Sequence, residues 1–248
     1  MTDTPLSPTS SIPAPRMLER YASRALLAAA LLLMLGYFVV YAAYAANLMR
    51  FPFDYDQGEG FELVDTLLFS RGEWPYRDTE SFPFYSSNYP PLFHVIAAPF
   101  VWLFGPAYWY GRLLGFLATL VTAAAIAYAV YHDGRRRGHK PALIAVLAGL
   151  AYLASNTVYH IGPLFRQHAS MVMFETLAVV LLAQVNEIEN TRQRRRTLAA
   201  GLLLVIAAGY TKQLAAVTAL AVGLFLFIRQ PRRALVWGAG AAIVGILI

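Results

Sequence analysis

The stretch ALLAAALLLMLGYFVVYAAYAA (residues 25–46) decides the fold class, because it is apolar throughout and holds no charged side chain. A helix needs about 17–25 apolar residues to cross the hydrocarbon core of a bilayer. Further apolar runs of comparable length cover residues 109–131, 142–159 and 170–185. The sequence therefore predicts an all-α, polytopic membrane helix bundle.

Composition and charge support a membrane protein and exclude several other classes. The 248 residues are 58% hydrophobic and 14% charged, with a mean hydropathy of +0.50, whereas about 25% of a soluble domain is charged. The absence of cysteine excludes disulfides and thiolate metal sites. The net charge of +6 lies in short clusters between apolar runs, a pattern typical of membrane topology. We therefore expect no nucleic-acid partner.

Four basic clusters predict the topology. They are Arg16, Arg20 and Arg24; Arg135, Arg136, Arg137 and Lys140; Arg192, Arg194, Arg195 and Arg196; and Arg229, Arg232 and Arg233. If all four are cytoplasmic, one of the three apolar segments between the first two clusters does not cross. Residues 91–104 are the candidate, because as a helix they span only about 21 Å of a core about 30 Å thick. We predict an interfacial helix there, about seven spans in all, and a cytoplasmic N-terminus.

This topology divides the chain into a tail and one membrane domain. Residues 1–24 are predicted to be a disordered cytoplasmic N-terminus, and residues 25–248 one transmembrane domain. Residues 47–108 form a large extracytoplasmic loop with interfacial helices. The remaining spans are predicted at residues 198–210, 214–228 and 234–248. The last has no polar flank, so we expect the domain to be incomplete at its C-terminus.

The long loop holds most of the acidic residues, beginning with Asp54, Asp56 and Glu59 directly after the first span. Residues 59–70 are predicted to form a short amphipathic helix in the interface, with its apolar and acidic residues on opposite faces. The acids either solvate the loop or perform chemistry. Carboxylates beside a bilayer suit general-base catalysis, because a low dielectric raises their pKa toward the operating range.

Four pieces of this loop occur in a characteristic order: DQGEG (residues 56–60), RGEWPYRD (71–78), SNYPPLF (87–93) and LFGP (103–106). Together they resemble the first-loop signature of the polyprenyl-phosphate-sugar-dependent membrane glycosyltransferases. That superfamily includes the protein O-mannosyltransferases and the aminoarabinose transferases of lipid A. The resemblance covers roughly residues 51–131.

The resemblance implies inverting transfer of a sugar from a polyprenyl-phosphate donor to a lipid, glycan or protein acceptor, with a first-loop carboxylate as general base. Relatives often have adjacent Asp and Glu here, whereas this chain has Gly58-Glu59. The base is therefore either Asp56 or Glu59. We favour Asp56, with Glu59 as a positioning residue or metal ligand and Asp54 as a third candidate. The resemblance allows a divalent metal, but the sequence shows no compact ligand cluster, and we assign no cofactor from it.

The donor phosphate requires a cation near the outer face, and Lys212 is the main candidate. It lies in GYTKQ (residues 209–213) at a predicted outer turn, and resembles a Thr-Lys element of the family. Alternatively, Lys212 snorkels to the interface. Arg166 and His168 are extracytoplasmic in this topology, where they bind phosphate or acceptor, or cap the loop. Tyr89 is a further substrate-binding candidate.

Two other functions fit a multi-pass protein of the cell membrane with these features. The chain could transport or flip lipid-linked sugars without chemistry, although such transporters usually contain internal repeats and none is evident. It could also be a non-catalytic remnant of a transferase.

Overall fold

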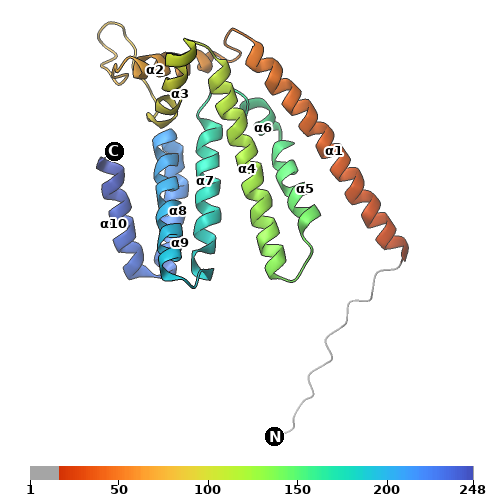
Figure 1. Cartoon of the computed structure of the whole chain (residues 1–248). Helices are drawn as coiled ribbons and strands as arrows, with labels where there is room; N and C mark the ends of the chain where they lie inside the picture. The colour runs from red at the N-terminus through yellow and green to blue at the C-terminus, as the bar shows by residue number, and fades with distance from the viewer. Residues whose placement is uncertain (1–16, 248) are drawn as a thin grey trace.

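The computed structural model describes residues 17–247, which are helical almost throughout (Figure 1). The elements are α1 (Met17–Arg50), α2 (Gln57–Ser70), α3 (Leu92–Phe104), α4 (Trp109–Arg136), α5 (Ala142–Leu153), α6 (Asn156–Ile161), α7 (His168–Gln184), η1 (Val185–Glu187), α8 (Thr191–Thr211), η2 (Gln213–Ala215), α9 (Ala216–Arg229) and α10 (Pro231–Leu247). Upright helices form the body of the molecule, α1 slants along one edge, and α2 and α3 lie across one end. These described residues contain no strand, so the predicted all-α class is confirmed.

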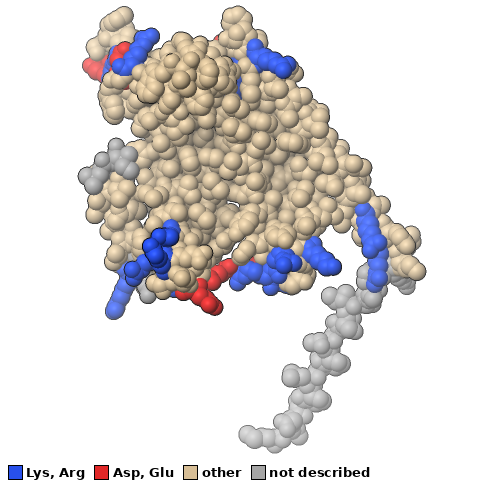
Figure 2. All heavy atoms as spheres, viewed as in Figure 1, with Lys and Arg blue, Asp and Glu red and all other residues tan. Residues whose placement is uncertain are grey.

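The bundle is built for a membrane. Among the described residues, three segments are long and apolar enough to cross a bilayer, Met17–Arg50, Trp109–Arg136 and His168–Glu187, and shorter apolar helices accompany them. Large apolar side chains face outward, as with Leu220 at 75% exposure. Figure 2 shows an uncharged band between two charged ends. We call the end covered by α2 and α3 the loop end, and the opposite end, where Lys and Arg gather, the basic end.

The first helix begins earlier than predicted. Residues 17–24 were expected to be disordered, but α1 starts at Met17 and runs unbroken to Arg50. Residues 17–24 contain neither Pro nor Gly, and Glu19 in the first turn of α1 interacts favourably with the helix dipole. Residues 1–16 of the predicted disordered tail lie outside the described residues.

A single span over residues 142–159 is also wrong, because two helices occupy this region. Helix α5 ends at Leu153, and α6 begins at Asn156. Between them Ser155 has an extended backbone, and its hydroxyl accepts a hydrogen bond from the Val158 amide at 3.3 Å. A serine that caps a new helix in this way competes with continuation of the old one.

The segment of residues 162–167, between α6 and α7, packs closely on α4. Two glycines four residues apart in α4 make this approach possible. A Cβ atom on Gly111 would lie 2.1 Å from the ring of Phe165, and one on Gly115 would lie 2.5 Å from a backbone oxygen of the segment. Phe165 in turn packs in a buried cluster with Phe93 of α3. This cluster fixes the segment at the loop end.

Candidate functional site

A fully buried arginine organises the loop end. Arg112 lies in the second turn of α4, and its guanidinium donates to both carboxylate oxygens of Glu59, at 2.9 and 2.7 Å. It also donates to the carbonyl oxygens of Leu48 and Phe51 at 2.6 Å, and of Phe53 at 2.7 Å. These bonds tie the end of α1 and the following loop to α2 and α4.

Glu59 is fully enclosed by these contacts. Besides Arg112, its carboxylate accepts hydrogen bonds from the backbone amides of Tyr55 at 2.8 Å and Phe165 at 2.7 Å. Both oxygens are therefore engaged twice, and the side chain is 0% exposed. A carboxylate so occupied can hold three segments in place, but it has no exposed oxygen that could accept a proton from a substrate.

Asp56 is the accessible carboxylate beside this anchor. It caps α2, where its side chain accepts the Gly58 amide at 3.0 Å, and it forms a two-pronged ion pair with Arg166 at 2.8–3.2 Å. Burial by itself would raise the pKa of Asp56, but the Gly58 amide and Arg166 outweigh it and lower the pKa. The Asp56 side chain keeps 38% of its surface exposed.

A glycine makes room for this ion pair. A Cβ atom on Gly58 would lie 1.8 Å from the guanidinium carbon of Arg166, so the cation rests directly on the first turn of α2. Arg166 arrives there on the segment that packs against α4. The path of that segment is therefore what brings Asp56 and Arg166 together across 110 residues of sequence.

A second carboxylate faces Arg166 from deeper inside. Glu62 lies 3.9 Å from the Arg166 guanidinium and 3.4 Å from Nε2 of His94, and with its amide suitably turned Gln167 donates to it at 3.1 Å. Burial raises the pKa of Glu62 to about 8, against the opposing effect of Arg166, with the nearby Asp65 raising it further. The site thus combines one exposed, ion-paired carboxylate with one buried carboxyl that is readily protonated.

The remaining acid on this face of α2, Asp65, is bound by residues of the loop between α2 and α3. Asp65 accepts hydrogen bonds from the hydroxyls of Tyr85 at 2.8 Å and Ser87 at 2.6 Å, and lies 3.7 Å from Nε2 of His94. His94 is completely buried, and burial lowers its pKa to about 4. These contacts secure the residues around Tyr89 on the polar face of α2.

Lys212 closes the site from the far side. It ends α8, and its ammonium group donates to Nε2 of His168 at 2.5 Å and lies 4.9 Å from the centre of the Tyr89 ring. Burial lowers the pKa of Lys212, Glu62 raises it, and Arg166 lowers it further. The next residue, Gln213, donates to the Asn88 carbonyl oxygen at 3.0 Å. The turn between α8 and α9 is therefore joined to the loop.

The structure brings most of the residues proposed from sequence into one cluster. In one part of the cluster, Asp56 and Arg166 form an ion pair. In the other part, Lys212 contacts His168 and Tyr89. Glu59 lies behind them as an anchor. Asp54 stands apart, exposed, with a carboxylate oxygen 3.7 Å from where a Cβ atom on Gly60 would lie.

Sequence reasoning missed several members of the site: Glu62, Asp65, His94, Arg112 and Gln167 were not proposed. A signal existed for Arg112, because a charge inside an apolar span is costly unless it is paired. The spacing of Glu59, Glu62 and Thr66 also places polar side chains along one helix face. No group of three or more His, Cys, Asp or Glu among residues 17–247 could hold a metal ion, so no residue is assigned as a metal ligand.

The loop end of this helical membrane bundle thus gathers carboxylates and cations from distant parts of the chain. The chain matches the model of glycosyltransferase family 87 over residues 88–248 and belongs to that family. It is thus a membrane glycosyltransferase. The matched region contains Tyr89, Arg166 and Lys212, and it begins after Asp56. No curated protein and no solved structure matches the chain.

Proposed function

We propose that this glycosyltransferase moves a sugar from a polyprenyl-phosphate donor to an acceptor hydroxyl on the extracytoplasmic side, as the polyprenyl-phosphate-sugar-dependent superfamily does. The observation that carries this proposal is the convergence of Asp56, Arg166 and Lys212, from three distant segments, at the loop end. Two cations beside an exposed carboxylate suit a substrate with a phosphate leaving group. The basic end is cytoplasmic in this orientation, following the positive-inside rule.

An apolar groove supports a lipid-linked donor. A cavity of about 440 Å³ lies between α8, α9 and α10, lined mainly by apolar side chains such as Val205, Ile206 and Val222, with Pro90 also on its wall. Pro90 follows Tyr89, which stacks on Lys212. An isoprenoid chain in this groove would therefore bring its phosphate to the cation.

In the proposed reaction the acceptor hydroxyl oxygen attacks the anomeric carbon of the donor. The bond between that carbon and the phosphate oxygen breaks, and the phosphate leaves on its lipid with the electron pair. Arg166 and Lys212 stabilise the negative charge that develops there. Asp56 takes the proton of the acceptor hydroxyl, and Glu59 acts as a positioning residue through Arg112.

The ion pair between Asp56 and Arg166 requires the donor to bind before Asp56 takes up a proton. Without donor, Arg166 lowers the pKa of Asp56 and makes it a weak base. A donor phosphate competes for the same guanidinium, because an Arg–phosphate pair has the same two-pronged geometry. Donor binding thereby releases the carboxylate when the acceptor needs it.

The test uses the full chain in proteoliposomes with a panel of polyprenyl-phosphate hexoses and pentoses, and follows release of polyprenyl phosphate. Asp56→Asn is expected to lower the rate by about 10²–10⁴-fold, the usual value of general-base catalysis, with donor binding retained. Asp54→Asn is the matched control, because Asp54 lies outside the cluster, and it should keep the parent rate.

Several results would change the assignment. If Glu59→Gln abolishes transfer while it stays folded and binds donor, and Asp56→Asn retains transfer, the two roles are reversed. Full transfer in both variants would remove the loop from the catalytic site. Movement of lipid-linked sugar across the bilayer without release of polyprenyl phosphate would favour the flippase.

Lys212 is tested separately through donor binding. Lys212→Met should weaken binding of the donor more than Lys212→Arg does, because any cation keeps most of a phosphate contact. Equal affinity of the parent and both variants would return Lys212 to a purely interfacial role.

A further inference from the structure

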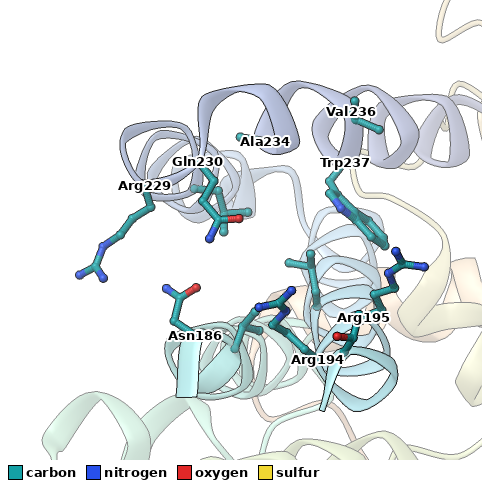
Figure 3. Close-up of a pocket in the computed structure, with 12 residues that line it drawn as sticks. Asn186, Arg194, Arg195, Arg229, Gln230, Ala234, Val236 and Trp237 are labelled. Carbon is teal, nitrogen blue, oxygen red and sulfur yellow. The ribbon is translucent and has the colours of Figure 1, made fainter. Parts of the chain in front are cut away.

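The basic end contains a second hollow, far from the site described above. It has a volume of about 510 Å³ and lies where the ends of α8, α9 and α10 meet η1 (Figure 3). Arg194, Arg195 and Arg229 line it together with Asn186 and Trp237. These side chains come from four elements, η1, α8, α9 and α10, and in Figure 3 the Arg229 side chain extends away from Arg194 and Arg195; its guanidinium lies over the Phe225 ring at 5.1 Å.

The arginines of this hollow differ from their neighbours at the same end. Arg136 is paired with Glu187, and Arg137 with Asp133. Within residues 17–247, Arg194, Arg195 and Arg229 form no ion pair with an acidic side chain.

The position of Arg194 and Arg195 near the start of α8 also favours an anion. Helix α8 begins at Thr191 and has no acidic residue in its first turn, so its arginines stand at the positive end of the helix dipole. Cations are disfavoured there, and negative charge is favoured. An anion in the hollow would satisfy the arginines and the helix end together.

The hollow is amphipathic. Besides the arginines, its lining contains the apolar residues Val185, Leu198, Leu226 and Val236. Leu226 and Ala234 also border the apolar groove between α8, α9 and α10, so the hollow adjoins that groove. Trp237 is a residue type that prefers the boundary between headgroups and hydrocarbon.

We infer that this hollow binds an anionic phospholipid of the leaflet at the basic end, with its phosphate beside Arg194 and Arg195 of α8, Arg229 at the rim, and an acyl chain against the apolar lining. Charge complementarity selects the headgroup, because basic pockets between membrane helices suit anionic lipid headgroups. The apolar lining distinguishes a lipid from a soluble phosphate. The inference does not depend on the identity of the sugar donor.

Trp237 provides the readout. The full chain is placed in lipid nanodiscs of phosphatidylcholine containing increasing fractions of brominated phosphatidylglycerol, and the fluorescence lost by the parent is compared with that lost by Trp237→Phe. The difference reports quenching at Trp237. We expect half-maximal quenching at a roughly ten-fold lower mole fraction with brominated phosphatidylglycerol than with brominated phosphatidylcholine. Equal quenching by the two lipids in the parent chain overturns the inference, whatever the behaviour of any variant.

Two triple variants distinguish a specific lipid site from general electrostatic attraction of anionic lipids to the basic end. Replacing Arg194, Arg195 and Arg229 by Gln should abolish the preference for the anionic lipid. Replacing Arg135, Arg137 and Lys140 by Gln removes the same charge from the same end, outside the hollow, and should preserve the preference. Equal losses in both variants would reduce the effect to nonspecific surface attraction. Reversal of the quenching by millimolar glycerol phosphate would identify a soluble phosphate ligand and refute a lipid.

Discussion

Arg112 shows how one charge inside an apolar helix is tolerated. The N–H groups of its guanidinium donate to both carboxylate oxygens of Glu59 and to three backbone carbonyl oxygens. A buried ion pair adds little net stability compared with an apolar pair of the same shape, but removing one partner leaves an unpaired buried charge. The pair therefore specifies where α2 sits more than it strengthens the fold.

We expect Arg112→Met and Glu59→Gln each to destabilise the protein by about 3–5 kcal/mol, because each leaves the other partner buried and unsatisfied. The double variant should be less destabilised than the sum of the two. Thermal unfolding in detergent measures this. The exposed pair Arg77–Glu73 is the matched control, and Arg77→Met should cost only about 0.2–1 kcal/mol. Additive losses in the double variant would contradict the coupling.

Glu62 should make stability depend on pH. Its pKa rises from an ordinary 4.5 to about 8 in the folded protein, so its contribution to stability is fully present below pH 4.5 and is lost as pH rises through about 8. Glu62→Gln should therefore shrink the difference between Tm at pH 5 and at pH 8, by at least about 2–4 °C for each kcal/mol involved.

Burial also lowers the pKa of His94 to about 4, and this shift is present in the parent and in Glu62→Gln, because burial and not Glu62 is its largest cause. Glu73→Gln, at an exposed position, controls for the loss of a carboxylate. Parallel Tm profiles for the parent and Glu62→Gln would show that Glu62 is already ionised at neutral pH.

Helix α2 is the element in which sequence and structure differ most instructively. Its two faces were predicted correctly, since Glu62, Asp65 and Thr66 lie together and are buried, while Phe61 and Val64 are exposed. Periodicity reveals that a helix has two faces, but it does not reveal which one points inward. Here the polar face points inward, because its partners come from α3, α4 and the segment before α7.

The glycines of α2 allow a paired test. Gly58→Ala places a Cβ atom against the Arg166 guanidinium, the flexible end of that side chain, whereas the atom nearest a Cβ on Gly60 is 3.7 Å away. Alanine favours a helix over glycine by about 1 kcal/mol, so both variants should fold. Gly58→Ala should displace Arg166 and weaken donor binding about ten-fold or more, and Gly60→Ala should bind donor like the parent. Equal donor affinity in the two variants would place Arg166 outside the donor site.

At the scale of the whole molecule, hydropathy and basic clusters predicted most of the architecture. The short segment of residues 91–104 forms α3 and lies across the loop end, and the predicted spans correspond to α1, α4, α5 with α6, and α7 to α10. The union of Asp56 with Arg166 was beyond such reasoning, because it depends on packing between segments far apart in sequence. The break at Ser155 is a local capping effect, which hydropathy and charge clusters do not report.

The orientation of the bundle can be tested with single cysteines, because the natural chain has none. Cysteines at positions 137 and 195 should resist an impermeant reagent in intact cells, and one at position 72 should react. All three should react once the membrane is permeabilised. Labelling of position 137 in intact cells would show that the orientation in the membrane is the reverse of the predicted one, with the acidic loop on the other side.

The distance along the chain between Asp56 and Arg166 also has a meaning in time. Their ion pair joins residues 110 positions apart, and a ribosome adding about 5–20 residues per second takes roughly 5–20 seconds to make that interval. In the later part of this period the nascent acidic loop has left the ribosome, while Arg166 has not been made. The first turns of α2, with Asp56, Gly58 and Glu62, then stay exposed to water until the later helices enter the membrane. Maturation of the site is consequently a late event of biosynthesis, and a chain stalled before Arg166 would carry its carboxylates without the cation that pairs with them.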